Sequence, residues 1–118
     1  KGAPRTPSYN LSMEARADHH PTIAKMGLLS AQTAECIDET FRNRWRTLMS
    51  VDDLVDALVA TAERLGVLDE TYFFYTSDHG FQLGEFNILM DKRLAYDWDT
   101  RVHCAVRGPG VRLRIRRR

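Results

Sequence analysis

The sequence is poor in cysteine, has no long apolar run and shows no leader pattern. Its two cysteines, Cys36 and Cys104, are too few for a disulfide framework, and their apolar neighbours predict that both are buried free thiols. No apolar run approaches the roughly 20 residues of a membrane-spanning helix, so we expect no transmembrane segment. The first residues lack the charged, apolar and small-residue order of a secretory signal, so they do not reveal where the protein is sent.

Length and composition bound the size of the core. With 118 residues, of which 43% are apolar and 28% are charged, the chain is expected to form at most one globular domain. A domain of this length buries only roughly 60 to 70% of the surface that its unfolded chain exposes. The hydrophobic core must therefore be small.

The net charge of +1 hides an asymmetry along the chain. Residues 107–118 hold six arginines and no acid, which leaves 11 basic against 16 acidic groups before them, a balance of −5. The arginine-rich end could bind a polyanion by charge alone. Its alternation of arginine with aliphatic residues carries no base-reading signal, so we expect no nucleic acid partner, and an unpacked chain end is the simpler interpretation.

Three segments differ in pattern. Residues 1–30 contain three of the four prolines and no sustained hydrophobic period, which predicts an irregular connecting segment. Residues 31–110 carry the periodic elements and form the predicted domain, and residues 111–118 form a basic tail that we expect to be unstructured. In the first segment, His19 and His20 resemble a ligand cluster, but adjacent histidines need additional geometry to share a metal, so a solvated loop is favoured.

The periodic segment begins with a helix and continues with two strands. Apolar residues at three- and four-residue spacing predict a helix from about Ala34 that ends at Gly66, a natural left-handed stop. Residues 50–53 match a capping box, so the pattern fits either one long helix or two in tandem. The aromatic run at residues 71–76 predicts a buried strand, and the apolar run at residues 102–106 predicts a second short strand.

The aromatic strand is followed by Asp78, His79 and Gly80. In an open parallel sheet, polar side chains collect where strands end, because the strands there hold the loops in place. Asp78 offers carboxylate oxygens and His79 an imidazole, and Gly80 permits the turn that consecutive side chains need in order to face one ion. The same residues also fit a turn in which Asp78 caps the backbone and His79 is exposed, so this motif alone leaves both interpretations open.

A lysine follows in the next loop. Lys92 lies fourteen positions after Asp78 and is flanked by Asp91 and Arg93. An ammonium group beside a divalent ion can neutralise a tetrahedral oxyanion, which suits an anionic substrate. The alternative interpretation of Lys92 is a solvated surface charge.

Several separated motifs, in order along the chain, resemble the C-terminal part of a sulfatase catalytic domain. The motifs are Arg44–Val55, Thr76–Phe86, Asp91–Arg93, Tyr96–Val102 and Arg107–Gly110. The likeness is greatest to the N-acetylglucosamine-6-sulfatases and the related arylsulfatases and heparan-sulfate endosulfatases. It covers most of residues 36 to 111.

This resemblance implies a fold and a site. The fold would be α/β, a fragment of an alkaline-phosphatase-like mixed sheet flanked by helices. Asp78 and His79 would be the second pair of ligands of a calcium ion whose first pair are aspartates near the N-terminus of the family's catalytic domain. Calcium prefers oxygen ligands, so His79 also brings a softer divalent ion into consideration. The lysine that matches Lys92 would contact the substrate sulfate and stabilise its developing charge.

The chain departs from the family pattern at the nucleophile, at the first pair of metal ligands and at His103. In the family, the nucleophile is a formylglycine made from the cysteine of a Cys-x-Pro/Ala-x-Arg motif, and neither Cys36 nor Cys104 begins such a motif. The first aspartate pair is also missing, and His103 stands where proline is common in close relatives, so we assign it no catalytic role. We therefore expect a piece of a sulfatase that is inactive alone, whose parent protein carries the formylglycine.

The parent would hydrolyse sulfate esters of sugars or aryl groups, with glycosaminoglycans among the candidate substrates, and would be lysosomal, secreted or on the cell surface. Three alternatives remain open: a phosphoesterase or phosphonate hydrolase of the same superfamily, a fragment that binds polyanions through its basic tail, and an inert fragment whose sheet lacks neighbouring strands. Substrate identity and oligomeric state do not follow from the sequence.

Overall fold

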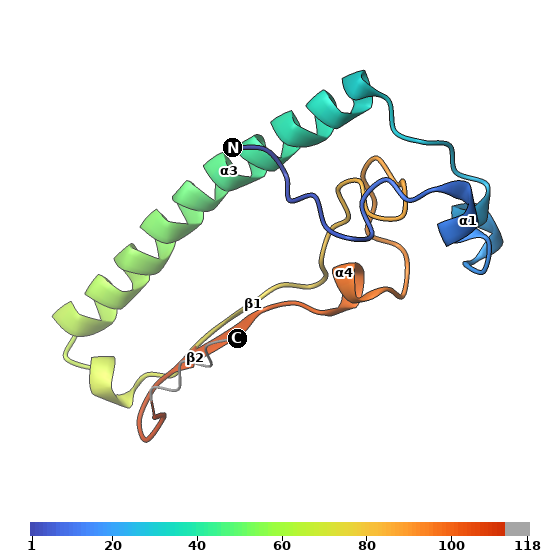
Figure 1. The fold of residues 1–118 in the computed structure, drawn as a ribbon. Coiled ribbons are helices and arrows are strands. Elements are labelled where there is room, and N and C mark those ends of the chain that lie inside the picture. Colours follow the sequence, from blue (N-terminus) through green and yellow to red (C-terminus); the bar gives the residue numbers. More distant parts are fainter. Residues whose placement is uncertain (113–118) are drawn as a thin grey trace.

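A computed structural model describes residues 1–112 of the chain, so the predicted basic tail lies outside the described residues except for Val111 and Arg112. The chain is elongated, with extents of 58 × 26 × 25 Å. In chain order, its elements are α1 (Met13–Arg16), α2 (Pro21–Ala24), α3 (Ala31–Arg64), the 3₁₀ helix η1 (Leu68–Glu70), β1 (Phe73–Thr76), α4 (Asp97–Thr100) and β2 (Cys104–Arg107). Figure 1 shows α3 along one side and the two strands along the other.

Helix α3 is a single helix of 34 residues. It begins at Ser30, whose hydroxyl accepts a hydrogen bond from the Thr33 N–H, and its interior contains no glycine or proline that would interrupt it. Gly66, with φ at +72°, ends the helix as expected, and the Val67 N–H donates to the Ala62 carbonyl in a Schellman motif. The capping box at residues 50–53 is not used, because its backbone is helical and continuous with the turns on both sides.

The hydrophobic core lies near the start of α3. Ile37 is fully buried there against Ala3 from the N-terminal segment and Leu83 from the loop after β1, with Phe41 packed at the edge of the cluster. Farther along α3, large apolar residues such as Leu54 remain exposed. Within the described residues, neither strand contacts α3, and the element that packs against its second half is η1, which follows it along the chain.

The two strands form a small antiparallel sheet. Phe73 pairs with Arg107 and Thr76 with Cys104. The prediction that the aromatic strand is buried is wrong. Among the described residues, β1 is mostly exposed, and Phe74 has 72% of its surface accessible. The physical reason is that these residues supply one neighbouring strand and no layer above the sheet. The helices and this two-stranded sheet constitute a fragmentary α/β arrangement.

The prediction of buried thiols is also wrong. Cys36 and Cys104 are both free and exposed. Cys36 precedes the buried Ile37 on α3, and one residue along a helix is a rotation of about 100°, which places it on another side of the helix. Cys104 lies in β2, which is exposed along its whole length.

Residues 1–30 contain two four-residue helices and no strand. Arg16 is buried there, and its guanidinium donates to the carbonyl of Leu11 at 3.0 Å. Asn10 accepts a hydrogen bond from the Leu29 N–H through its side chain, which joins the two ends of this segment. No helix in the described part of the chain is both long enough and apolar enough to span a membrane.

We expect Ile37→Ala to lower the free energy of unfolding by about 2 to 5 kcal/mol, because it removes a fully buried side chain and leaves a cavity. The matched control is Leu54→Ala in the same helix, where the side chain is 57% exposed and the loss should be much smaller. Urea denaturation followed by far-UV circular dichroism measures both. Equal losses in the two variants would contradict a core centred on Ile37.

Candidate functional site

The turn that follows β1 brings the side chains of Asp78 and His79 together. Asp78 Oδ1 accepts hydrogen bonds from the His79 N–H at 2.9 Å and from the Ser77 hydroxyl at 3.3 Å. Asp78 Oδ2 lies 2.9 Å from His79 Nε2. The hydrogen bond from the His79 N–H is the largest influence that lowers the pKa of Asp78 below its ordinary value, so its carboxylate form is favoured.

The imidazole of His79 is oriented by the backbone. Its Nδ1 lies 2.9 Å from the Gly80 carbonyl, which can only accept, so Nδ1 carries the hydrogen and donates. Nε2 lies 2.9 Å from Asp78 Oδ2, and in the neutral ring with hydrogen on Nδ1 it would be the nitrogen free to bind a cation. One nitrogen and one oxygen donor therefore face the same small volume at the end of β1.

Gly80 is required by close packing. A β-carbon at this position would lie 1.8 Å from the carbonyl oxygen of Trp98, and the Gly80 N–H donates to the Asp99 carbonyl at 2.8 Å. We expected glycine here for the freedom of a sharp turn, but its φ is not in the left-handed region. The absence of a side chain instead allows the turn after β1 to lie directly against α4.

The loop that carries Lys92 is tied to the same turn. The Gln82 N–H donates to the Asp91 carbonyl at 2.9 Å, which forms an isolated β-bridge. The guanidinium of Arg93 binds the Asp91 carboxylate through two nitrogens at 2.9 Å each, and the Lys92 N–H donates to the same carboxylate at 2.7 Å. These bonds lower the pKa of Asp91 to about 2, with the Arg93 side chain as the largest cause.

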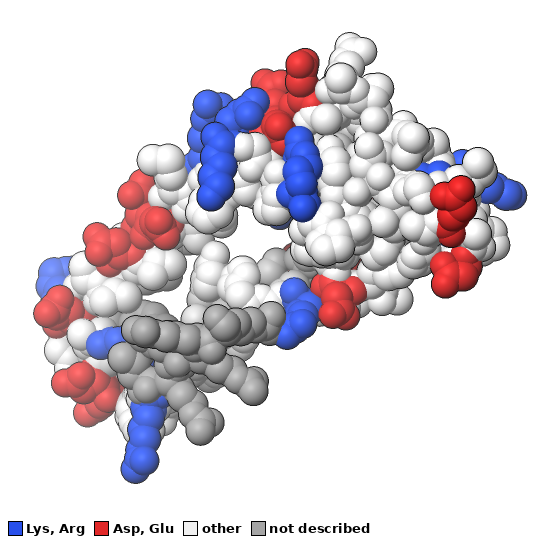
Figure 2. Space-filling model, viewed as in Figure 1, with Lys and Arg blue, Asp and Glu red and all other residues white. Residues whose placement is uncertain are grey.

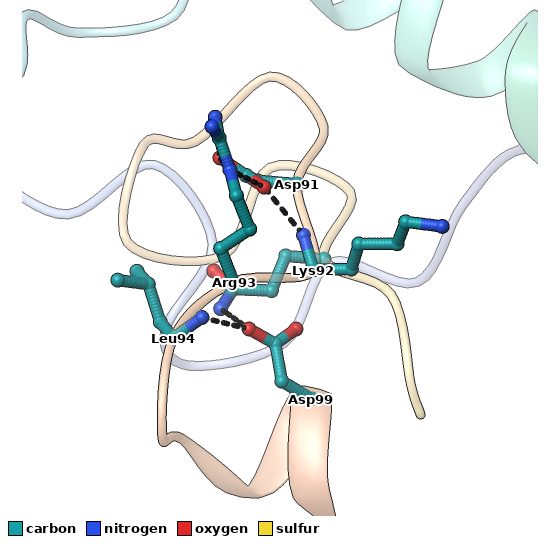
Figure 3. A network of polar contacts seen from close by, with 6 residues as sticks. Asp91, Lys92, Arg93, Leu94 and Asp99 are labelled. Carbon is teal, nitrogen blue, oxygen red and sulfur yellow. Dashed lines mark hydrogen bonds and ion pairs between the residues drawn. The ribbon is translucent and has the colours of Figure 1, made fainter. Parts of the chain in front are cut away.

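The side chain of Lys92 is exposed and extends away from Asp91 and Arg93 in Figure 3. Within the described residues, its ammonium forms no hydrogen bond or ion pair, so it makes neither with Asp78 or His79. The structure therefore brings Asp78 and His79 together and leaves the ammonium of Lys92 directed toward solvent. A charge without a protein partner is available to an anion from outside the chain.

Asp99 is an important residue of the site that the sequence interpretation missed. It is only 4% exposed, and its Oδ2 accepts from the Leu94 N–H at 2.7 Å and from the Gln82 side-chain amide at 3.1 Å. Figure 3 shows this carboxylate below the loop that carries Lys92. Asp99 thereby joins that loop to the turn after β1. Its position in a four-residue helix gave no local signal of burial.

Other buried polar residues anchor the loop to the N-terminal segment. The side-chain amide of Asn87 donates to the carbonyls of Leu11 at 3.1 Å and Gly27 at 2.8 Å. The Glu85 carboxylate accepts from the Thr6 hydroxyl at 3.5 Å and, within the loop, from the Leu83 N–H at 2.7 Å. Polar residues interspersed between two apolar runs were the available signal for these anchors.

The histidines at 19 and 20 do not form a common site. His19 Nδ1 is hydrogen-bonded to the Tyr96 hydroxyl at 3.2 Å, and its ring packs against Phe86 with the centroids 5.3 Å apart. His20 instead accepts from the Thr22 N–H as the N-cap of α2. Both therefore have structural contacts, and His19 is half-buried rather than freely solvated.

The donor set at Asp78 and His79 fits part of a cation site. The oxygen and nitrogen lie 2.9 Å apart, close to the separation of neighbouring ligands on an ion with bonds of about 2.3 to 2.6 Å. Calcium takes six to eight ligands in total, mostly oxygen. Over residues 1–112, no cluster of three or more His, Cys, Asp or Glu side chains could hold a metal ion. Two donors alone do not fill such a coordination shell.

Comparison with known proteins identifies the family. The sulfatase family model matches residues 5–117, which is nearly the whole chain. The chain belongs to the sulfatase family. It is 40% identical over 111 residues to N-acetylglucosamine-6-sulfatase of Homo sapiens, 38% identical over 110 residues to an arylsulfatase of Volvox carteri, and 37% identical over 112 residues to an extracellular sulfatase SULF-1 homolog of Drosophila melanogaster.

These alignments cover 93%, 92% and 90% of this sulfatase chain but only 20%, 17% and 9% of the respective relatives. The chain thus spans about a fifth or less of these curated sulfatases. No solved structure is significantly similar to it. The expectation of a sulfatase relative is confirmed, and the metal ligands and the role of Lys92 stay predictions.

Asp99→Ala should reduce the free energy of unfolding of this sulfatase chain by about 1 to 3 kcal/mol, because it leaves the Leu94 N–H and the Gln82 amide without their acceptor. The control is Asp97→Ala, which removes an exposed carboxylate that is 3.8 Å from Arg101 and should cost at most about 1 kcal/mol. Urea unfolding provides both values. A loss in the control as large as that in Asp99→Ala would show that the buried carboxylate has no special role.

Arg93→Gln should raise the pKa of Asp91 from about 2 toward its ordinary value of about 3.9. Because the folded state holds this pKa low, Asp91 contributes stability fully above pH about 4 and loses that contribution as the pH falls toward 2. Carboxyl-detected NMR titration of Asp91 in the two proteins measures the shift. An Asp91 pKa near 4 with Arg93 present would refute the ion pair in solution.

Proposed function

We propose that this chain is a segment of a sulfuric ester hydrolase that cleaves sulfate esters of sugars or aryl groups. The observation that carries the proposal is the paired carboxylate and imidazole at the end of β1, joined by a backbone bond to the loop that carries Lys92, whose ammonium has no partner within residues 1–112. Family membership and relatives named N-acetylglucosamine-6-sulfatase and arylsulfatase support it. The finer fold is part of an alkaline-phosphatase-like mixed sheet flanked by helices.

Each named residue has a defined role in this proposal. Asp78 Oδ2 and His79 Nε2 are two ligands of a calcium ion, with the Gly80 carbonyl holding the imidazole in the required tautomer. A bound calcium ion would supply positive charge and Lewis acidity toward the sulfate oxygens. Lys92 binds the sulfate group of the substrate and stabilises the negative charge that develops on its oxygens.

Asp91 and Arg93 position Lys92 without contacting substrate. Arg93 neutralises the Asp91 carboxylate, so that this acid does not attract the neighbouring ammonium away from the anion. The Lys92 N–H bond to Asp91 fixes the backbone at the point where the lysine side chain leaves the loop. The cation is thus placed by its neighbours and left free to bind.

The nucleophile is supplied from outside this sequence. Neither Cys36 nor Cys104 is followed by the Pro/Ala-x-Arg pattern of a formylglycine precursor, so the 118-residue chain alone should not turn over a sulfate ester. The longer protein would contribute the formylglycine and the remaining calcium ligands. The name of the Drosophila relative, an extracellular sulfatase, supports a secreted or cell-surface location for such a protein.

A chimera tests the proposal. Residues 5–112 would replace the matching segment of the human N-acetylglucosamine-6-sulfatase, to which the chain is 40% identical. We expect the chimera to hydrolyse N-acetylglucosamine 6-sulfate, and Lys92→Ala to lower kcat by about 10² to 10³-fold, because an oxyanion-stabilising cation is lost. Asp78→Ala should weaken calcium binding, measured by calorimetry on the apo chimera.

Lys25→Ala is the control, since it removes an exposed cation from the N-terminal segment. A Lys92→Ala chimera with undiminished kcat would refute the role of the lysine. Hydrolysis of the corresponding phosphate monoester with no activity on the sulfate would favour the phosphoesterase alternative, because both anions are tetrahedral and Lys92 alone does not distinguish them.

A further inference from the structure

We propose that a groove between the N-terminal residues and the first half of α3 binds a sulfated polysaccharide. The groove is lined by residues 1–4 and by Phe41, Arg42, Trp45 and Arg46 of α3, and we call it the α3 groove. None of these residues belongs to the candidate site. The inference therefore concerns a second binding surface on the same chain.

The lining of the α3 groove is mostly apolar and carries only positive charges. Its charged residues are Lys1, Arg42 and Arg46, and it includes no acidic residue. Arg42 and Arg46 are four residues apart, so they lie on the same side of α3 and are roughly 6 Å apart along its axis. Neither forms an ion pair with any of residues 1–112. Figure 2 shows lysine and arginine side chains over this half of the helix, with a group of acidic side chains next to them.

An acidic residue beside the α3 groove is already paired. Asp38 lies one turn before Arg42, and its carboxylate accepts from the Ala3 N–H at 2.9 Å and pairs with Arg5 at 2.9 Å. Burial alone would raise the pKa of Asp38, but the bonds from Ala3 and Arg5, with a smaller coulombic contribution from Arg42, outweigh it and lower the pKa. Arg5 thus provides most of the countercharge of Asp38, and neither Arg42 nor Arg46 is ion-paired within residues 1–112.

An exposed aromatic ring lies beside the cations of the groove. Trp45 is 60% exposed, and its ring meets Phe41 edge-on, with the centroids 6.2 Å apart and the planes at 72°. Arg46 donates a hydrogen bond of 2.7 Å from one guanidinium nitrogen to Asn43, and within residues 1–112 its other nitrogens form no hydrogen bond. The groove therefore combines an exposed apolar ring with two guanidinium groups of the same helix.

The α3 groove lies beside the apolar stripe of α3 rather than on it. At about 100° per residue, Arg46 is about half a turn away from the buried Ile37, whereas Leu48 and Val55 are on the same side as Ile37. A polypeptide that covered the apolar stripe would leave both arginines accessible. The positive charge of the groove therefore does not depend on whether the apolar side of α3 is covered.

A sulfated polysaccharide has the matching chemistry. Guanidinium groups bind tetrahedral oxyanions through two nitrogens, and two of them one helical turn apart suit a polymer with repeated sulfates. The C–H face of a sugar ring can cover the indole of Trp45. The choice of sulfate rests on the proposed function, in which the same polymer would be held at the groove while its sulfate esters are cleaved elsewhere.

The test is calorimetric titration of the 118-residue chain with a heparin hexasaccharide and with the same oligosaccharide after chemical desulfation. We expect binding of the sulfated form only, with an affinity that falls as salt is raised. Arg42→Ala/Arg46→Ala should weaken binding by about tenfold or more, and Trp45→Ala by about two- to tenfold. Far-UV circular dichroism checks that each variant keeps its helix.

The matched control is Lys25→Ala/Arg64→Ala, which removes two exposed cations elsewhere and should leave the affinity unchanged. The inference is overturned if this control weakens binding as much as the groove variant, or if replacing the tail arginines with serine abolishes it. Equally tight binding of single-stranded DNA, anionic vesicles or the desulfated sugar would also overturn it. Since the titration requires no catalysis, its result is independent of the chimera assay.

Discussion

The carboxylate of Asp99 connects the two parts of the candidate site. A buried carboxylate is costly unless its oxygens are hydrogen-bonded. Here Oδ2 accepts from both the Leu94 N–H and the Gln82 amide, whereas Oδ1 is buried without a partner among residues 1–112. The Asp99 backbone carbonyl also accepts from the Gly80 N–H. Asp99 therefore binds three parts of the chain: the loop that carries Lys92, through Leu94; the segment after the turn, through Gln82; and the turn itself, through Gly80. Together with the backbone bond from the Gln82 N–H to the Asp91 carbonyl, it connects the acid–imidazole pair to the loop with the ammonium.

The packing of the chain is uneven. Its core joins the N-terminal segment, the start of α3 and the loop after β1 around Ile37, and this is the region that holds the candidate site. The later half of α3 and both strands are apolar in sequence but exposed. A sheet of two strands is at best marginally stable by itself, and the chain spans about a fifth of the sulfatases it matches. The exposed apolar surface is consistent with a piece of a larger layered domain.

Local signals in the sequence were enough for several features of the fold and the site. Ser30 and Gly66 lie at the ends of α3 because a side-chain cap and a left-handed residue act within one turn of the chain. The sequence also indicated a turn at Asp78 and His79, but it left open whether the turn holds a metal ion or lets Asp78 cap the backbone; the Asp78 carboxylate does accept from the His79 N–H. The motifs, by their residues and their order along the chain, were also sufficient to indicate the sulfatase family.

Only the tertiary structure decided the features that depend on residues far apart in the sequence. The antiparallel pairing of β1 with β2, the exposure of Cys36 and Cys104, and the burial of Asp99 each depend on which segment packs alongside. Gly80 illustrates the difference: its identity suggested a turn, but its reason is the carbonyl of Trp98, eighteen residues later. The type of a residue indicates which backbone conformations it favours, whereas the contacts that the residue makes depend on how the whole chain packs.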